Sequence, residues 1–567
     1  MGRLLKVLSY LVFGAVTVAV AYFAFSRRGP GVSDNSTLYV RMSGALPEEG
    51  SSSVLSPFLA DRPTLRDMIG MLQRAKTDPR VKAVVIMPSV GSAGWAQLQE
   101  LRGVVAEVRT AGKPMTAFLE SASATDYYLA TAANRIVMVP GGSLDLTGVA
   151  TYELFFRGTL DKFGIVADLL HIGEYKTYAN TFTQKSMTPA HREMNASLNR
   201  ETYNELVRAI ADGRKKTEPE IRAALDAGPY LAPEAKAAGL IDATAYEDEL
   251  DDTPPVSGTT RLLAADYGIH GTDAGFRAPK VALLYAVGEI ASGKSSIDAT
   301  GSTVLGSETF VEWVRAARAD SSIRAIVIRI DSPGGSALAS EVIWRELMLT
   351  RDVKPVIVSM GNVAASGGYY IAAPAHAIVA EPGTITGSIG VVTGKYVVSG
   401  ALDKLGIGIG VVSDGAMSGL NSPFREFTPA ERAKVETHMQ ATYEDFLAKV
   451  ATARRSTPQK IDAIAQGRVW SGRQARELGL VDALGGLDAA VALAKSRAKI
   501  AEGTIVDLQV YPQRRGFLEV LSKPLGGEAT EQWRSSPLMK ASAVLEQMTR
   551  YRPGEPLLLM PRTFTVK

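Results

Sequence analysis

The sequence has no cysteine, few histidines and almost no net charge, and each shortage excludes a class of protein. Without cysteine, the 567 residues can form no disulfide, thiolate metal site or cysteine nucleophile. The five histidines form no HExxH or His-x-His motif, so we expect no histidine-rich metal site. We also expect no cofactor. The 62 basic and 59 acidic residues give a net charge of +3 without a long basic run, which argues against nucleic-acid binding.

Length and composition indicate a folded protein with several domains. Hydrophobic residues make up 46% of the chain and charged residues 21%, which is ordinary for globular proteins and argues against extended disorder. The length exceeds what one hydrophobic core normally holds, so we expect several domains of roughly 100 to 200 residues each.

The N-terminus carries a hydrophobic run long enough to cross a membrane. Residues 8–25 are apolar and uncharged, with basic residues on both sides. A run of about 18 residues just suffices for a transmembrane helix. A cleaved signal peptide is the alternative, but such a peptide normally ends in small residues, whereas this run ends in aromatic ones. We therefore predict an uncleaved anchor over residues 1–28, while the balanced flanking charges leave its orientation open.

The remainder of the chain is a duplication. The segment GTLDKFGI begins at Gly158, and GALDKLGI begins 242 residues later at Gly400. Other pairs of similar segments recur at offsets of 242 or 240 residues, far longer than a solenoid repeat. We predict five parts: a membrane anchor (1–28), a first repeat (36–250), a linker rich in Pro, Gly, Ser and Thr (251–277), a second repeat (278–505) and a C-terminal tail of unknown role (506–567).

Each repeat has the pattern of an α/β domain. In the second repeat, short apolar runs rich in β-branched residues alternate with segments of helical periodicity. The predicted strands are 281–285, 325–330, 355–360 and 377–382, and the predicted helices include 309–319 and 340–350. The order strand, helix, strand predicts parallel strands joined by crossover helices.

Ser366 stands where a predicted strand gives way to a short apolar helix. A hydroxyl at a helix start suits nucleophilic attack, because free backbone N–H groups and the helix dipole stabilise a developing oxyanion. The alternative is that Ser366 is an ordinary N-cap. Upstream, the turn IDSPGGS ends in Gly334 and Gly335 and either supplies a second oxyanion donor or is only a Pro-Gly turn.

Four motifs together resemble a known family. DSPGG, SMxxxAASGGYY and TGSIGV in the second repeat, with GEYKT in the first, are similar to the signal peptide peptidase SppA family in its long, duplicated (67K-type) form. The resemblance covers nearly the whole chain, including the anchor. It implies a fold of the crotonase and Clp-protease group, present twice, and a serine protease with a serine–lysine dyad and no histidine.

The resemblance also implies roles for individual residues. It assigns the nucleophile to Ser366, the general base to Lys176, the orientation of the lysine amine to Ser388, and the oxyanion hole to the peptide groups of Gly335 and Gly367. The family often has proline five residues after the lysine, where this chain has Thr181. That departure concerns the shape of the loop rather than the lysine itself.

The duplication provides an independent check on this assignment. In the repeat alignment Ser366 corresponds to Ala124, and Lys176 corresponds to Ser418. Ser388 and Gly335 correspond to Leu146 and Ala93, so the first repeat lacks the nucleophile apparatus and the second lacks the lysine. Neither repeat holds a complete dyad, but together they hold one. Chance degeneration is the alternative to an active site shared between the repeats.

A lysine can act as the base only if it is neutral. An exposed lysine has a pKa near ~10.4 and carries a proton at neutral pH, whereas burial disfavours the ammonium and lowers the pKa by several units. The neutral amine can accept the serine proton and return it to the leaving amine. Other candidates are weaker. Ser496 and Lys499 match an SxxK pattern in a charged helical stretch, and His376 precedes a strand.

These observations predict a membrane-anchored serine endopeptidase. The resemblance implies remnant signal peptides as substrates, a homotetramer, and a single-pass protein of the inner membrane with its soluble part facing the periplasm. Two alternatives come from other classes. A crotonase-type acyl-CoA enzyme would not need Ser366, because an oxyanion hole also suits thioesters. A non-catalytic membrane scaffold would not react with a serine-directed acylating probe.

Overall fold

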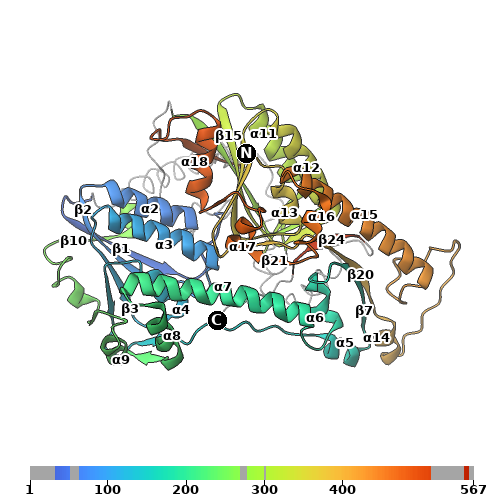
Figure 1. The fold of residues 1–567 in the computed structure, drawn as a ribbon, viewed down its shortest axis with the longest axis horizontal. Helices are drawn as coiled ribbons and strands as arrows, with labels where there is room; N and C mark the ends of the chain where they lie inside the picture. Colours follow the sequence, from blue (N-terminus) through green and yellow to red (C-terminus); the bar gives the residue numbers. More distant parts are fainter. Residues whose placement is uncertain (1–31, 51–62, 269–277, 299–301, 512–554, 561–567) are drawn as a thin grey trace, which may run out of the picture.

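The structure contains one parallel and one mostly parallel β-sheet, each covered by helices, and a mixed sheet that joins them (Figure 1). This computed structural model describes residues 32–50, 63–268, 278–298, 302–511 and 555–560. The predicted anchor at residues 1–28 lies outside them. Among the described residues, no helix combines the length and the hydropathy needed to span a membrane.

The first repeat is built on six parallel strands in the order β10-β1-β2-β3-β5-β9. They are β1 (Ser36–Ser43), β2 (Val81–Ser89), β3 (Met115–Leu119), β5 (Arg135–Met138), β9 (Ala243–Thr244) and β10 (Thr260–Leu263). Helices α2 (Leu65–Thr77) and α3 (Trp95–Thr110) connect β1, β2 and β3, as crossover helices do in parallel sheets. Beside them lie α4 (Ala124–Ala130) and the small sheet of β4 (Ala122–Ser123), β6 (Ser143–Asp145) and β8 (Tyr230–Leu231).

The second repeat has the same plan. Its sheet runs β21-β19-β17-β15-β11-β23, and β17 also pairs with β18, which pairs with β22. The strands are β11 (Lys280–Val287), β15 (Ile323–Ser332), β17 (Val356–Ala365), β18 (Ala377–Ala380), β19 (Ile385–Gly387), β21 (Val469–Ser471), β22 (Ala483–Leu484) and β23 (Asp507–Tyr511). The helices include α11 (Ser307–Ala319), α12 (Ala337–Arg351), α13 (Gly367–Ala372), α17 (Gly472–Glu477) and α18 (Leu487–Arg497). The predicted α/β class and the predicted strands and helices of this repeat are confirmed.

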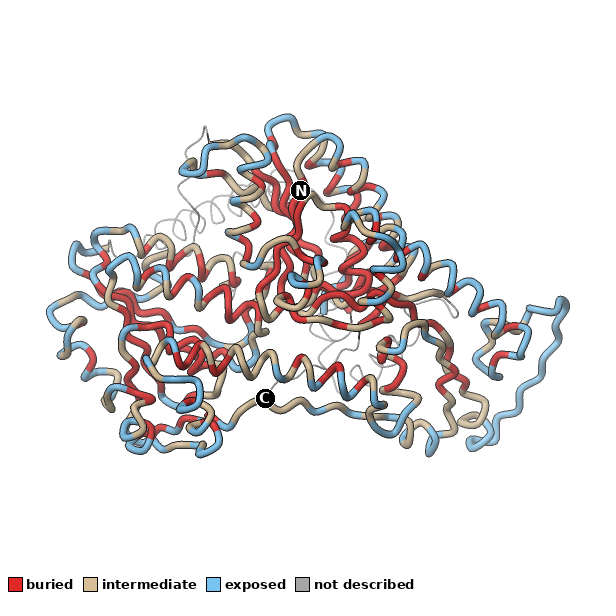
Figure 2. Tube along the Cα trace, viewed as in Figure 1, coloured by how far each residue is buried: buried red, intermediate tan, exposed pale blue. Residues whose placement is uncertain are grey.

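Both sheets are buried on both faces, which explains their continuous apolar strands (Figure 2). In β2 and β15 the central residues are fully buried. One of these buried residues is charged: Arg329, in the middle of β15, has a guanidinium that donates to Glu48 at 2.9 Å and to Glu100 at 2.8 Å. Both carboxylates belong to the first repeat, and all three side chains are buried. This ion-pair cluster therefore clamps the two repeats together.

The structure differs from the predicted domain limits at two edges. Within the predicted linker, β10 adds to the first sheet beside β1. At the start of the predicted tail, β23 adds to the second sheet beside β11 in the equivalent place. Polar, turn-forming residues surround both short strands. The sequence pattern therefore did not predict them. Each repeat therefore closes its sheet with a final strand, and the second one extends to Tyr511.

A mixed sheet contains strands from both repeats and joins them. Its order is β13-β14-β12-β16-β24-β20-β7, with β7 (Val166–Ile172) from the first repeat antiparallel to β20 (Val391–Val397) from the second. The others are β12 (Glu289–Ala291), β13 (Ser296–Ile297), β14 (Thr303–Gly306), β16 (Gly334–Ser336) and β24 (Leu557–Leu559). Helix α7 (Pro189–Arg214) contacts α4 in one repeat and β21 in the other (Figure 1). These connections bring the loop after β7 to the second repeat.

Candidate active site

Ser366 lies on a strained turn between β17 and α13. Its backbone has φ 55° and ψ −113°, a region that residues other than glycine rarely occupy. Its N–H donates to the carbonyl of Gly387 at 2.8 Å, which holds the turn in place. The hydroxyl makes no capping hydrogen bond to α13, so the alternative role as an N-cap is not realised. Strain of about 1–3 kcal/mol at one residue is typical of functional turns.

Lys176 reaches this turn on the loop that follows β7. The backbone N–H of Tyr175 donates to the carbonyl of Gln466 in the second repeat at 2.8 Å. Gly467 packs directly on the lysine backbone, because a Cβ at Gly467 would lie 2.5 Å from the Cβ of Lys176. Arg468 stacks on the ring of Tyr175, 4.7 Å from its centre. The lysine is thus positioned by residues of the opposite repeat.

The structure brings Lys176, Ser366 and Ser388 together in one chain. The Lys176 Nζ lies 2.7 Å from Ser366 Oγ, 3.0 Å from Ser388 Oγ and 2.9 Å from the Ser388 carbonyl oxygen. All three residues are completely buried. Ser388 also has a positive φ of 51°, and its N–H donates to the Arg468 carbonyl at 2.7 Å.

Burial lowers the pKa of Lys176 well below its ordinary value. No carboxylate is among the hydrogen-bond partners of its amine, so no opposite charge there offsets the effect of burial. A neutral amine has two N–H groups and one lone pair. The two N–H groups can donate to the carbonyl and hydroxyl oxygens of Ser388, which leaves the lone pair for the hydroxyl hydrogen of Ser366. This arrangement can take up the serine proton.

Replacing Ser388 by alanine should lower kcat/KM for peptide hydrolysis by about tenfold to a hundredfold, because one hydrogen bond to the amine is lost. The Ser388 carbonyl would still accept from Lys176, so activity should not disappear. Steady-state kinetics of Ser388→Ala and Ser388→Gly test this. Glycine suits the positive φ, and an equal loss in both variants assigns the effect to the hydroxyl. Unchanged kinetics in both would contradict this role.

The predicted oxyanion donors lie side by side. A Cβ at Gly367 would lie 3.1 Å from the backbone nitrogen of Gly335, and a Cβ at Gly334 would lie 2.6 Å from the backbone nitrogen of Gly367. Such a Cβ would not fit, which is why glycines stand here. The carboxylate of Asp331 accepts from the N–H of Val363 at 2.9 Å and so supports the strand before Ser366. The turn DSPGG and the start of α13 therefore form one backbone surface.

A strand from the tail lies beside this surface, and the sequence prediction missed it. Strand β24 pairs antiparallel with Gly334, Gly335 and Ser336 of β16 on one side and with β20 on the other. The N–H of Met560 donates to the carbonyl of Pro333 at 3.0 Å. Its side chain joins an apolar cluster with Ala365, the residue before Ser366. The only signal in the sequence is the short apolar run LLLM after a long polar stretch.

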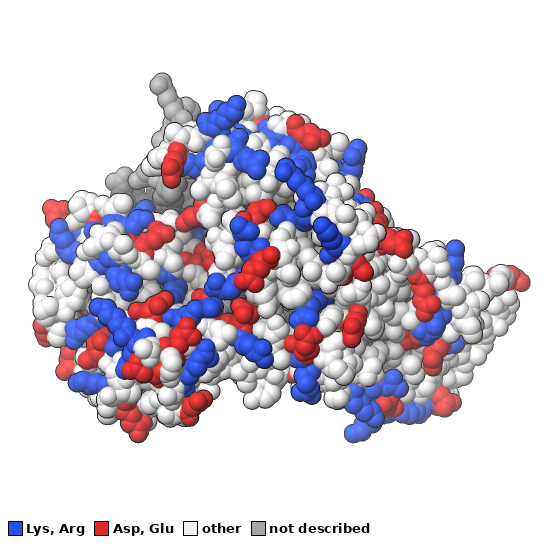
Figure 3. Space-filling view, in the orientation of Figure 1, with Lys and Arg blue, Asp and Glu red and all other residues white. Residues whose placement is uncertain are grey.

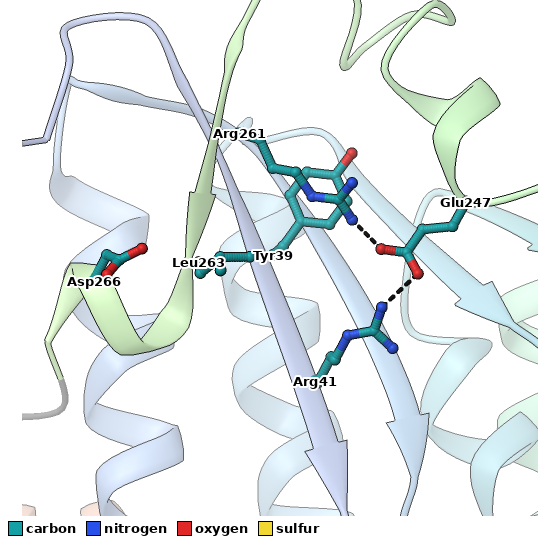
Figure 4. Close-up of a pocket in the computed structure, with 6 residues that line it drawn as sticks. All are labelled: Tyr39, Arg41, Glu247, Arg261, Leu263 and Asp266. Atoms are coloured by element: carbon teal, nitrogen blue, oxygen red, sulfur yellow. Dashed lines mark hydrogen bonds and ion pairs between the residues drawn. The ribbon is translucent and has the colours of Figure 1, made fainter. Parts of the chain in front are cut away.

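The other candidate catalytic residues from the sequence lie outside this site. His376 accepts from the backbone N–H of Val356 at 3.1 Å, and Ser496 and Lys499 are exposed at the end of α18. A separate surface pocket in the first repeat has Arg41 and Arg261 on either side of Glu247 (Figure 4). Because the carboxylate binds both guanidinium groups, the pocket keeps little positive charge for an anionic ligand. Basic and acidic residues also mix on the face drawn in Figure 3.

A nucleophilic hydroxyl on a strained turn at a helix start, in contact with a buried amine and beside a glycine turn, is the arrangement of a serine hydrolase. The family model named "Peptidase family S49" matches this chain twice, over residues 107–253 and 349–501. The chain therefore belongs to peptidase family S49. The two matches fall in the two repeats, which confirms the duplicated domain. The narrower relation to the crotonase and Clp-protease group stays a prediction.

Curated relatives agree with this assignment. "Protease 4" of Salmonella typhi is 32% identical over 84% of this chain and 80% of its own length. "Serine protease SPPA, chloroplastic" of Arabidopsis thaliana is 34% identical over 75% of this chain, which spans 64% of that protein. "Putative signal peptide peptidase SppA" of Enterococcus faecium is 30% identical over 35% of this chain and 58% of its own length. The predicted long form is confirmed by the first of these.

Proposed function

We propose that this chain is a membrane-anchored serine endopeptidase in which Lys176 activates Ser366 to hydrolyse remnant signal peptides and other membrane-derived peptides. The observation that carries the proposal is the 2.7 Å separation of Lys176 Nζ and Ser366 Oγ in a fully buried site. Membership in family S49 supports the peptidase reaction. The name of the Enterococcus relative supports the substrate class.

The first half of the reaction forms an acyl-enzyme. The neutral amine of Lys176 takes the hydroxyl proton as Ser366 Oγ attacks the scissile carbonyl carbon. The carbonyl oxygen becomes an oxyanion, which the peptide N–H groups of Gly335 and Gly367 stabilise. The tetrahedral intermediate then breaks its C–N bond. The ammonium of Lys176 donates its proton to the leaving amine, and the lysine is neutral again.

The second half releases the acyl group. A water molecule enters where the amine left and gives a proton to Lys176 as its oxygen attacks the ester carbon. The C–O bond to Ser366 then breaks, and the serine oxygen recovers the proton from the lysine. Throughout the cycle Ser388 holds the amine with its carbonyl and hydroxyl oxygens. The charged form of Lys176 exists only while the site also holds a negative oxyanion.

The place of β24 between β16 and β20 suits an extended, apolar peptide as substrate. A peptide that added a strand between β16 and β20 would bind through backbone hydrogen bonds, with pockets for alternate side chains. Leu558, Leu559 and Met560 already occupy this place with buried side chains. Fragments of signal peptides have the same apolar character, because a signal peptide contains an uninterrupted apolar core.

The proposed function is tested by labelling and cleavage. A fluorophosphonate probe should modify purified protein at Ser366, as located by mass spectrometry of its peptides. The same preparation should cleave synthetic signal peptides faster than hydrophilic peptides of equal length. Modification at another serine, or no cleavage of any apolar peptide by protein that the probe labels, would contradict the proposal.

Removing β24 should leave the edges of β16 and β20 free to pair with a peptide. A chain that ends at residue 554 should show a KM for apolar peptides lower by about tenfold, because a tethered strand competes at an effective concentration in the millimolar range. The control is a chain that ends at Met560, which keeps β24 and should behave like the full chain. Equal KM values for all three chains would show that β24 does not occupy the substrate groove.

The same proposal includes location and assembly. Residues 1–28 would anchor the chain in the inner membrane by a single span, with the soluble part in the periplasm and the site close to the bilayer where apolar fragments arise. The protein would work as a homotetramer. Fractionation of chains with and without residues 1–28 tests the anchor, since only the longer chain should need detergent for extraction.

A further inference from the structure

Ser332 of the turn DSPGG carries a fully buried hydroxyl that the proposed reaction does not use. Its Oγ accepts a hydrogen bond from the backbone N–H of Gly334 at 3.2 Å. A serine hydroxyl that accepts from the N–H two residues later forms an ST turn, which is a common local motif. The hydroxyl therefore either stabilises a turn or also shapes the oxyanion hole beside it.

The duplication provides the same turn without this hydroxyl. The 242-residue offset aligns Ser332 with Val90 and Gly335 with Ala93. In the first repeat the turn closes on itself, because the N–H of Ala93 donates to the carbonyl of Val90 at 2.8 Å. The strand β2 leads into this turn and the helix α3 follows it, as β15 and α12 do in the second repeat. The unit of strand, turn and helix therefore folds without a hydroxyl at this position.

The turn of the second repeat is held open instead. A closed turn would join the N–H of Gly335 to the carbonyl of Ser332, and residues 332–335, all of which the structure describes, contain no such hydrogen bond. Here the Ser332 hydroxyl binds the N–H of Gly334, whose φ of 99° is a conformation that favours glycine. The N–H of Gly335 is therefore not used to close its own turn.

Ser332 also lies between the two elements that carry the proposed oxyanion donors. Its backbone pairs with Ala364, two residues before the nucleophile. Its carbonyl oxygen packs against α13, because a Cβ at Gly368 would lie 2.7 Å from it. On the other side of the turn, a Cβ at Gly367 would lie 3.1 Å from the backbone nitrogen of Gly335. A change in the shape of the turn would therefore move the Gly335 peptide relative to Gly367.

We propose that Ser332 is a positioning residue for the oxyanion hole. Its hydroxyl holds the N–H of Gly334 and so keeps the turn open. The N–H of Gly335 then remains directed, together with that of Gly367, at the oxygen that becomes negative in the transition state. The inference rests on the proposed peptidase function and adds to it a residue that acts through Gly335 without touching the substrate.

The first repeat lacks this hydroxyl together with the catalytic residues around it. Ala124 stands at the position of the nucleophile, Ala93 at that of Gly335 and Val90 at that of Ser332. Because the first repeat keeps the fold without these residues, a purely structural role for the hydroxyl would give no reason for their joint absence. A role in positioning the oxyanion donors gives one.

Replacing Ser332 by alanine tests this role, because the change removes the hydroxyl and little else. We expect kcat for an apolar peptide to fall by about tenfold to a hundredfold, since loss of a whole oxyanion donor costs about 10²–10³-fold and Gly335 here is only misdirected. KM and the pH dependence of activity should stay unchanged, because the Lys176 amine bonds to other residues. The control is Thr350→Val, which removes a fully buried hydroxyl at the far end of α12 and should leave kcat unchanged.

Two inhibitors separate positioning from a general disturbance of the site. Ser366 Oγ adds to the carbonyl carbon of a peptide aldehyde, and the former carbonyl oxygen takes up the serine proton and occupies the oxyanion position. The peptide alcohol of the same sequence has no carbonyl and cannot form this adduct. In Ser332→Ala, the inhibition constant of the aldehyde should rise by about the factor by which kcat falls, while that of the alcohol stays the same.

An unchanged kcat in Ser332→Ala would overturn the inference, and so would an equal loss of affinity for the aldehyde and the alcohol. A shift in the pH at which activity falls would also overturn it, because the hydroxyl would then act on Lys176. If wild-type protein cleaves peptides with the same kcat as Ser332→Ala, the proposed function stands and only this inference fails. If wild-type protein neither cleaves apolar peptides nor binds the aldehyde, both fail.

Discussion

Ser366→Ala and Lys176→Ala should each lower kcat/KM for peptide hydrolysis by about 10³-fold or more, and the double variant should be no less active than either single one. The nucleophile and its base act as a unit, so losing one removes the benefit of the other. The buried contact between Nζ and Oγ is the physical reason, since neither group has another partner for this proton transfer. Single-turnover and steady-state kinetics on one apolar peptide measure all three variants.

A matched control comes from the second serine–lysine pair in the chain. Ser496 and Lys499 have the SxxK spacing but are exposed, so Ser496→Ala and Lys499→Ala should leave kcat/KM unchanged. Full activity in Lys176→Ala would contradict the assigned base. A double variant less active than both single variants by a further large factor would contradict the coupling of the two groups.

The activity of wild-type protein should fall tenfold per pH unit below the pKa of Lys176. Burial lowers that pKa, and the neutral amine is the active form, so protonation at lower pH removes the base. This fall in activity should begin at a pH well below the pKa of an exposed lysine, which is about 10.4. A Lys176→Arg variant should be inactive at every pH, because its guanidinium does not lose its proton. Activity that first appears only above about pH 10 would contradict a lowered pKa.

The same lowered pKa should make the wild-type protein less stable at neutral pH than a Lys176→Met variant. Between the folded pKa and the unfolded pKa, the unfolded chain binds a proton that the folded chain does not. The stability of wild type therefore rises with pH across that window, whereas Lys176→Met lacks this dependence. Denaturant midpoints measured for both proteins from pH 6 to pH 10 should converge as pH rises. Parallel curves would contradict the linkage.

Sequence reasoning reached the fold class because the strands of the second repeat, such as β15 and β17, carry mostly apolar, β-branched runs between segments of helical periodicity. The duplication was visible because the GxLDKxGI segments keep their spacing, and the reciprocal loss of Ser366 and Lys176 between the repeats pointed to a shared site. Local sequence patterns could not show which contacts bring Ser366 and Lys176 of the two repeats together. The β7–β20 pairing, α7 and the loop contacts of Gly467 join residues hundreds of positions apart.

What the sequence hid has identifiable physical causes. Strands β10, β23 and β24 are short and stand among polar residues, so no alternation marks them. The buried ion pairs of Arg329 are marked only by a charge inside an apolar strand, and its partner Glu48 lies in a loop of the other repeat. The site assignments of Ser388, Gly335 and Gly367 came from the family resemblance.

The most direct measurement is the titration of the Lys176 amine itself. In protein labelled with ¹³C at the lysine ε-carbons, the signal of Lys176 can be assigned by its absence from Lys176→Met and followed from pH 5 to pH 11. An ε-carbon that titrates well below the other lysines would mean that a neutral amine faces Ser366 at working pH. A Lys176 signal that titrates together with the exposed lysines would mean that the amine is protonated there and cannot be the base.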